Sequence, residues 1–201
     1  MKIYTKTGDD GETGLLGGVR VSKSHLAIST CGALDETNSL IGVSRSALWA
    51  ERNELANKVS FDDVDKVLGE IQNDLFDIGS RVASCLGRTR RSDFPESRSA
   101  ELEQEIDRFE SELPPLTAFI LPGGNTIGSR LHLARSVCRR SERELVSLVQ
   151  SGIEQPLGPE LVYLNRLGDL LFVLARVANL RAQFPETQWV ARSGSPPDSK
   201  D

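Results

Sequence analysis

The sequence has little that would hold a protein in a membrane or bind a metal through thiolates. None of its apolar runs approaches the roughly 18 residues that span a bilayer, and its first residues lack the apolar core of a secretion signal. Its cysteines, Cys31, Cys85 and Cys138, form no CxxC pair, and neither His25 nor His132 lies in an HExxH or ExxH pattern. These absences exclude a disulfide framework, most zinc hydrolases and carboxylate di-iron bundles. They predict a cytoplasmic protein with no membrane span and no metal site of its own.

The charge balance argues against nucleic acid as a partner. There are 24 basic and 29 acidic side chains, for a formal net charge of −5, so no general positive field is present to hold a phosphate backbone. The chain has 201 residues, 38% of them hydrophobic and 26% charged, which is typical of one globular domain with a modest core. We expect a single domain over residues 1–189. The polar residues 190–201 are expected to form a disordered tail.

Apolar residues recur at helical spacing in five stretches. The second stretch is the clearest, because Val64, Val67 and Leu68 follow acidic residues that suit a helix start. The first helix is predicted to begin at Gly32, after an extended run over residues 27–30. The other four helices are predicted at about 62–86, 97–113, 125–150 and 158–182. Five helices with no convincing strand pair and no internal repeat predict an all-α bundle.

The region before these helices is different, because its glycines at positions 8, 11, 14, 17 and 18 do not suit a regular helix. We predict an extended, glycine-rich N-terminal loop. Backbone N–H groups, hydroxyls and a lysine in such a loop can hold a polyphosphate, although many glycine-rich loops only turn, and the pattern GxxxxGK[ST] is absent. Asp9, Asp10 and Glu12 are either solvated or close to a Mg²⁺ that accompanies a nucleotide.

The fourth predicted helix carries a charged stripe. Arg135, Arg139 and Glu142 lie at i, i+4 and i+7, and two arginines one turn apart form a fork that suits phosphate oxygens. The alternative is a solvated face of ordinary (i, i+4) pairs, such as Arg140 with Glu144. Spacing does not decide between the two interpretations.

The fifth predicted helix is the most apolar, yet it carries Asn165, Asp169 and Arg176 along one stripe. Buried charge is costly without a partner, so we expect partners in the bundle, in a neighbouring subunit or in a ligand. Asp35 on the first helix is a carboxylate that an arginine of the fourth could meet. Both tryptophans are interpreted as packing anchors, and both histidines as surface or interhelical residues.

Five sequence blocks together resemble one known family. They are YTKTGDDGETGLLGG at 4–18, GALDETNSLIG at 32–42, FILPGG at 119–124, ARSVCRRSERE at 134–144 and YLNRLGDLLFVLAR at 163–176. In this order they are similar to the PduO-type ATP:cob(I)alamin adenosyltransferases, also called corrinoid adenosyltransferases. The resemblance extends to about Trp189. It departs from the family pattern at Thr37, where leucine is frequent, and at Gly168, where serine is frequent, and neither change removes a candidate ligand.

The resemblance implies a fold and a site. The fold is a five-helix bundle that assembles as a homotrimer, with active sites between subunits. Phe119 would press on the lower corrin face, Arg139 would bind the triphosphate, and Asp35 would pair with Arg135 across the interface. These four residues are the candidate catalytic positions. The candidate nucleotide-binding residues are Thr5, Lys6, Thr7, Gly8, Asp9, Lys23, Arg139, Glu142 and Asn165, with Arg140 as a weaker candidate.

The implied reaction is attack by a Co(I) corrinoid on the 5′-carbon of ATP, which forms adenosylcobalamin and releases triphosphate. The chain would be a transferase of an alkyl group. Cobalt is the nucleophile, so the absence of a Ser, Cys or His triad is expected. The implied ligands are ATP with Mg²⁺ and cobalamin, and the implied partners are a reductase for Co(II) and an adenosylcobalamin-dependent acceptor enzyme. Two alternatives stay open here: a non-catalytic nucleotide sensor, and a structural bundle that uses its charged stripes for assembly.

Overall fold

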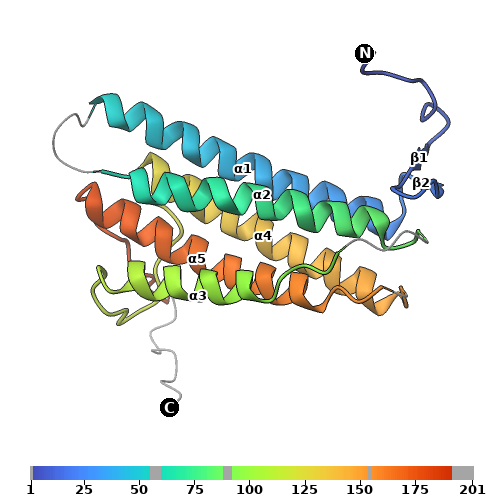
Figure 1. The fold of residues 1–201 in the computed structure, drawn as a ribbon. Helices are drawn as coiled ribbons and strands as arrows, with labels where there is room; N and C mark the ends of the chain where they lie inside the picture. The colour runs from blue at the N-terminus through green and yellow to red at the C-terminus, as the bar shows by residue number, and fades with distance from the viewer. Residues whose placement is uncertain (1, 55–59, 88–91, 154, 192–201) are drawn as a thin grey trace.

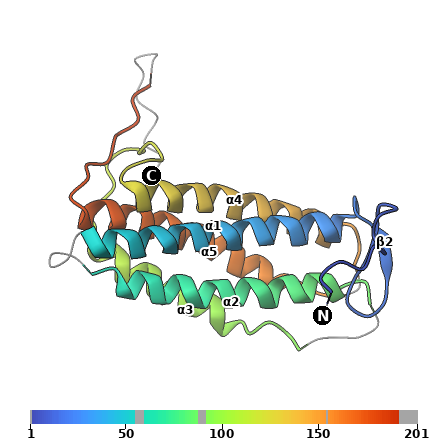
Figure 2. The same cartoon turned by 90° about the horizontal axis from the view of Figure 1, so that it is seen from above.

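The computed structural model describes residues 2–54, 60–87, 92–153 and 155–191. Within these residues, five helices form the body of the protein. Figures 1 and 2 show them side by side along one long axis. Their bounds are α1 Leu26–Glu54, α2 Asp62–Ser84, α3 Ser97–Glu110, α4 Thr126–Gln150 and α5 Gly158–Arg181. The prediction of an all-α, five-helix bundle is confirmed.

Local sequence signals explain several of the helix ends. α2 has three acidic residues in its first turn and Arg81 in its last, which complements the helix dipole at both ends. Asn125 precedes α4, and its side chain accepts a hydrogen bond from the Gly128 N–H at 2.7 Å. Pro159 lies in the first turn of α5, where its missing N–H is not needed. The bounds of α2 to α5 therefore lie close to those predicted.

α1 begins earlier than the sequence predicts, at Leu26, and residues 27–30 are helical rather than extended. Thr30 is fully buried, and its hydroxyl donates to Leu26 O at 2.9 Å and to Glu144 O at 3.3 Å. The prediction of an extended segment is wrong, because packing of this turn against α4 outweighs the weak local preference of its β-branched residues.

The glycine-rich N-terminal region contains a strand pair that the sequence analysis did not predict. β1 (Glu12–Gly14) and β2 (Arg20–Ser22) form a short antiparallel hairpin. Gly17 in the connection has a φ of +91°, which costs glycine no steric clash. The Leu16 N–H donates to Ala83 O at 2.9 Å, which docks the hairpin on the end of α2.

α5 lies in contact with both α3 and α4, while α1 packs on α4 and α2 packs on α1. Buried polar side chains join α2 to α5. The Tyr163 hydroxyl donates to Asp74 Oδ2 at 2.7 Å, and Arg98 donates to the same carboxylate at 2.6 Å. Nearer the end of α2, Arg81 pairs with the buried carboxylate of Glu160. Each of these buried charges has a partner, as burial requires.

After α5 the chain turns back along the segment that precedes α4. Ile120 and Gln188 form an isolated antiparallel bridge, and the Trp189 N–H donates to Phe119 O at 2.7 Å. Two segments far apart in the sequence are thereby held side by side. The tail predicted at 190–201 stays a prediction, because residues 192–201 lie outside the described part of the chain.

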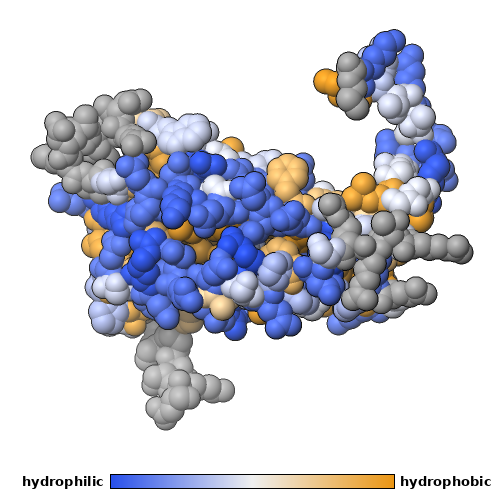
Figure 3. Space-filling view, viewed as in Figure 1, coloured by the Kyte–Doolittle hydropathy of each residue, from blue (hydrophilic) through white to orange (hydrophobic). Residues whose placement is uncertain are grey.

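The face of the molecule seen in Figure 3 is mostly polar. Figure 3 shows hydrophilic residues over most of the face that α1, α2 and α3 present in that view. Within the described residues, no helix is both long enough and apolar enough to cross a membrane. Trp49 is 53% exposed, and its indole N–H donates to Asp65 Oδ2 at 3.2 Å. The interpretation of Trp49 as a packing anchor is therefore wrong for the single chain.

Candidate active site

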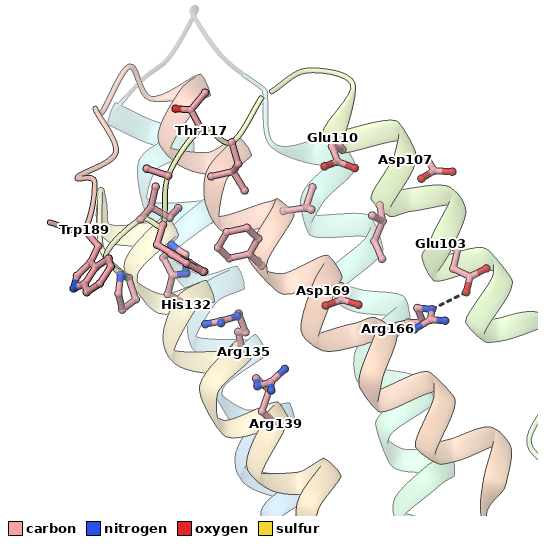
Figure 4. A pocket seen from close by; sticks show the side chains of 18 of the residues that line it. Glu103, Asp107, Glu110, Thr117, His132, Arg135, Arg139, Arg166, Asp169 and Trp189 are labelled. Atoms are coloured by element: carbon pink, nitrogen blue, oxygen red, sulfur yellow. Dashed lines mark hydrogen bonds and ion pairs between the residues drawn. The ribbon is translucent and has the colours of Figure 1, made fainter. Parts of the chain in front are cut away.

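A cavity of about 1620 Å³ lies between α3, α4, α5 and the segment that precedes α4. Ordinary small-molecule pockets measure roughly 300–1,000 Å³, so this space suits a larger ligand. Figure 4 shows that polar residues line three of its sides: His132, Arg135 and Arg139 from α4, Arg166 and Asp169 from α5, and Glu103, Asp107 and Glu110 from α3.

Arg135 and Arg139 project from α4 in the direction of α5 (Figure 4). They lie one helical turn apart, so both guanidinium groups reach the same cavity. The Arg135 guanidinium lies 5.4 Å from the centre of the Phe172 ring, within cation–π range. Among the described residues, neither arginine forms an ion pair within the chain. The fork predicted from the sequence is therefore present, and its positive charge is available to a ligand or a second chain.

An aromatic pair occupies another part of the cavity wall. Phe119 is 71% exposed and meets Trp189 edge-on, with ring centres 6.3 Å apart and ring planes at 80°. Both rings line the cavity. The interpretation of Trp189 as a packing anchor missed this position, because Trp189 reaches Phe119 only through the return of the chain after α5. No local pattern in the sequence indicates that return.

His132 is buried in the cavity wall, 3% exposed, with its ring 5.9 Å from that of Phe172. Neither ring nitrogen has a hydrogen-bond partner among the described residues. Burial lowers the pKa of this imidazole, and the nearby charge of Arg135 lowers it further, while Glu186 opposes the shift. His132 is therefore an interhelical residue, as predicted, and it stays uncharged at neutral pH.

A chain of hydrogen bonds joins the polar stripe of α5 to its neighbours. Asn165 Nδ2 donates to Glu142 Oε1 at 3.0 Å, so two predicted nucleotide-site residues meet in one chain. Arg166 donates to Asn165 Oδ1 at 2.8 Å and to Glu103 Oε1 at 2.7 Å. Asp169 lies on the cavity wall one turn further along α5.

Two other predicted charges find partners outside the cavity. Arg176 is buried; it pairs with Glu186 at 3.1 Å and donates to Pro114 O at 3.0 Å. This confirms the expectation that a charge on α5 needs a partner. Arg140 pairs with Glu36 of α1. It thus contacts α1 rather than the Glu144 carboxylate of the ordinary (i, i+4) alternative.

The N-terminal loop forms a compact turn around Gly8. The Lys23 ammonium lies so close that a Cβ added at Gly8 would be 3.3 Å from its Nζ. The hydroxyls of Thr5 and Thr7 are 2.9 Å apart, and both are exposed. Lys6 has a φ of +60°, which is uncommon for a side-chain-bearing residue and worth a functional explanation. The structure therefore brings the Lys23 ammonium to the loop beside Gly8, and its contact with a nucleotide stays a prediction.

Comparison with known proteins identifies the family. The family profile described as "Cobalamin adenosyltransferase" matches residues 3–178. The chain belongs to the cobalamin adenosyltransferase family. It is 41% identical over 191 residues to a corrinoid adenosyltransferase of Bacillus subtilis (strain 168), covering 94% of this chain and 92% of that protein. It is 40% identical over 185 residues to the corrinoid adenosyltransferase MMAB of Homo sapiens, covering 90% and 70%.

A solved structure extends the likeness to the whole adenosyltransferase fold. A variant PduO-type ATP:corrinoid adenosyltransferase from Lactobacillus reuteri, complexed with cobalamin and ATP, matches with a TM-score of 0.82 at 33% identity. The match covers 94% of this chain and 99% of that chain. The activity that family membership assigns to this chain is ATP-dependent adenosylation of a corrinoid.

In this adenosyltransferase, the predicted site residues fall into two groups. Figures 1 and 2 both place the hairpin at the end of the bundle opposite the segment that joins α3 to α4. The candidate residues of the N-terminal loop, including Lys23, are therefore not brought to Arg139 within one chain. Asp35 is exposed on α1 and, within the described residues, makes no ion pair with Arg135. Within the part of the chain that the structure describes, the cavity brings together the two arginines and the aromatic pair, and Glu142 and Asn165 bond to each other beside Arg166 of its wall.

Proposed function

We propose that this chain transfers the 5′-deoxyadenosyl group of ATP to the Co(I) centre of a corrinoid, forming adenosylcobalamin. An electron pair of Co(I) forms the new Co–C5′ bond while the C5′–O bond breaks, and triphosphate leaves with the electrons of that bond. Cobalt passes formally from Co(I) to Co(III), so the chain itself needs no nucleophile. The observation that carries the proposal is one cavity that holds an exposed aromatic pair together with two arginines one turn apart.

Phe119 and Trp189 are the proposed corrin-facing groups. An apolar ring below the corrin would exclude water and the corrinoid's own base from the lower face of cobalt. A Co(II) centre without that ligand is easier to reduce to Co(I). Phe119 is exposed to the cavity and backed by Trp189, so it has both the access and the support for this role.

Arg139 and the N-terminal loop are the proposed triphosphate contacts. Charge grows on the leaving triphosphate in the transition state, and preorganised cations stabilise it there. Arg139 offers a guanidinium with no ion pair within the described chain. The loop adds Lys6, Lys23 and the two threonine hydroxyls, with Gly8 and Asp9 in the turn. Glu142 and Asn165, already bonded to each other, would contact the nucleotide beside the cavity, next to Arg166 of its wall.

A homotrimer with sites between subunits would join these two groups of residues. Ile3 is 100% exposed and Tyr4 is 65% exposed, so the apolar start of the loop lacks cover in one chain. Val43 of α1 and Leu133 of α4 are 45% and 53% exposed on adjoining helices. In such a trimer the Asp35 side of α1 in one subunit would meet the cavity side of α4 in the next, pairing Asp35 with Arg135, two charges that stand apart in the single chain.

Mg²⁺ is proposed to arrive with ATP. The described residues hold no group of three or more His, Cys, Asp or Glu side chains that could bind a metal ion. Mg²⁺ in phosphoryl sites takes most of its ligands from phosphates and water and only one or two from carboxylates, so the exposed Asp9 or Asp10 fits this role. When bound, the ion would neutralise the triphosphate, while the loop and Arg139 orient it.

The cell context follows from the same chemistry. The reaction needs cobalt as Co(I), so a reductase that acts on Co(II) must precede it, and an adenosylcobalamin-dependent acceptor enzyme must consume its product. The three thiols are free, and Cys85 and Cys138 are buried. Free buried thiols support a reducing compartment, which we propose is the cytoplasm.

The direct test is anaerobic turnover of chemically reduced cob(I)alamin with ATP and Mg²⁺. We expect the Co(I) spectrum to convert to that of adenosylcobalamin at a rate far above that of the protein-free control. An Arg139→Ala sample shows whether the cavity described here carries the conversion. Binding of ATP without any conversion would overturn the proposal and favour the nucleotide-sensor alternative.

A further inference from the structure

Asn179, in the last turn of α5, is a buried amide that bonds to the turn before α4. It is 1% exposed. Its Oδ1 accepts the N–H of Asn125 at 3.0 Å, and its Nδ2 donates to Gly123 O at 3.1 Å. One side chain therefore satisfies both a donor and an acceptor of the turn that joins Phe119 to α4.

Two glycines make room for this amide. A Cβ added at Gly124 would lie 2.0 Å from Asn179 Oδ1, and one added at Gly128 would lie 2.3 Å from it. Gly124 also has a φ of +126°, which side-chain-bearing residues rarely adopt. The turn and the start of α4 thus close directly around the Asn179 side chain, and neither can shift without breaking a buried hydrogen bond.

The same residue begins the return of the chain after α5. Its carbonyl accepts the Phe184 N–H at 2.8 Å. From there the chain runs to Trp189, whose N–H bonds to Phe119 O. The side chain of Asn179 thus holds the segment of Phe119, and its backbone holds the segment of Trp189. The two segments that carry the rings are thus both tied to one position of α5, in addition to the direct bond between the Trp189 N–H and Phe119 O.

We propose that Asn179 is a positioning residue that sets the Phe119–Trp189 pair against the lower corrin face. The inference rests on the proposed function for its catalytic consequence, but the geometry of the pair can be measured without turnover. Loss of the amide contacts releases the turn and lets Phe119 move, while Arg139 and the N-terminal loop stay in place. The Co(II) route then suffers, because water reaches cobalt, whereas reaction of preformed Co(I) with ATP continues.

The main test compares Asn179→Ala and Asn179→Asp with the unmodified protein. The aspartate keeps the acceptor for Asn125 but places an oxygen against Gly123 O, so it removes only one of the two contacts. For Asn179→Ala, with ATP bound, we expect the fraction of four-coordinate Co(II), read by electron paramagnetic resonance, to fall on the order of tenfold or more. Turnover from cob(II)alamin with a reductant should fall in parallel, and turnover from cob(I)alamin should change less than about threefold.

A second measurement reads the ring pair directly. In a Trp49→Phe background Trp189 is the only remaining tryptophan, because the sequence has two. Asn179→Ala should shift its emission to the red and raise its quenching by acrylamide. Gly124→Ala, which presses on the same amide from the other side, should do the same. Thr30→Val is the control. It loses a buried hydroxyl near the start of α1, far from Asn179, and should leave the emission unchanged.

The outcomes separate the alternatives. One contrary result is that Asn179→Ala loses turnover equally from cob(I)alamin and cob(II)alamin, and that Thr30→Val of similar stability loses as much. That result would show that Asn179 has only a structural role, and it would overturn the inference. Unchanged Trp189 emission and unchanged four-coordinate Co(II) would also overturn it. If the unmodified protein fails to adenosylate cob(I)alamin, the proposed function fails instead, and the Trp189 measurement still decides the positioning role.

Discussion

The two ends of the bundle hold their candidate ligand residues in opposite ways. At one end, Thr5, Lys6 and Thr7 are exposed and contact mainly their own loop. At the other end, Phe119 and Trp189 are held by backbone hydrogen bonds and by the buried amide of Asn179. The comparison teaches that one chain can preorganise its proposed corrin side, while the nucleotide loop needs a ligand or another subunit to complete its contacts.

Arg139→Ala should give the largest effect, because it removes the proposed cation for the leaving triphosphate. We expect kcat with cob(I)alamin to fall by about 10²- to 10³-fold. The melting temperature should stay the same, since Arg139 is exposed. Arg143→Ala, an exposed arginine one turn further along α4, is the control. Normal turnover by Arg139→Ala would show that the triphosphate lies elsewhere.

Phe119→Ala tests the preorganised end alone. We expect turnover from cob(II)alamin with a reductant to fall by roughly 10²-fold, the loss typical of a misplaced group near the reacting atoms. Turnover from cob(I)alamin should fall much less, because Co(I) no longer depends on exclusion of a lower ligand. The two routes are compared on one protein sample. A Phe119→Leu variant keeps an apolar side chain, so its turnover from cob(II)alamin should lie between those of the unmodified protein and Phe119→Ala.

Lys6→Ala tests the loop end. A charge-assisted hydrogen bond to phosphate contributes about 1.5–3 kcal/mol, so the KM for ATP should rise by about tenfold or more. The thermal stability of the free protein should not change, because Lys6 is exposed and outside the packed bundle. Lys2→Ala, also exposed, is the matched control. If both variants raise KM equally, the loop contributes only general positive charge.

Asp35→Asn tests whether a second subunit joins the two ends. Removing one charge of a pair across an interface should weaken the trimer several-fold, which sedimentation velocity measures over a dilution series. Arg135→Ala should have the same effect, and the double variant should add little to either one. Fully additive effects would show that Asp35 and Arg135 do not contact each other.

The smallest effect concerns the pH dependence of stability. Burial lowers the pKa of His132 below its ordinary value near 6.5, so the unfolded chain binds its proton more readily than the folded chain. The contribution of neutral His132 to the free energy of unfolding is therefore complete above about pH 6.5, and it declines as the pH falls below that value. His132→Gln should flatten the fall in melting temperature between about pH 7 and pH 5.5, as calorimetry can measure. An unchanged slope would mean that groups other than His132 dominate it.

Helix periodicity predicted α2 to α5 closely, because their apolar faces and end signals are local properties of the chain. Two predictions on the N-terminal side were wrong. Residues 27–30 became helical because Thr30 is buried against α4. The strand pair at Glu12–Gly14 formed in a region that composition describes only as a loop. A contact between distant segments decided the first, whereas the second pairs neighbouring residues across a tight connection that composition alone does not reveal.

The sequence by itself determined the helix count, the fork of Arg135 and Arg139, and the family resemblance, since each depends on residues close together along the chain. Only the tertiary structure decided that Trp189 meets Phe119, that His132 is buried in the cavity wall, and that Asn179 closes the turn. The physical reason is that a buried amide or ring takes its role from partners that folding brings to it. Those partners lie 54 to 70 residues away along the chain, at Asn125 from Asn179 and at Phe119 from Trp189.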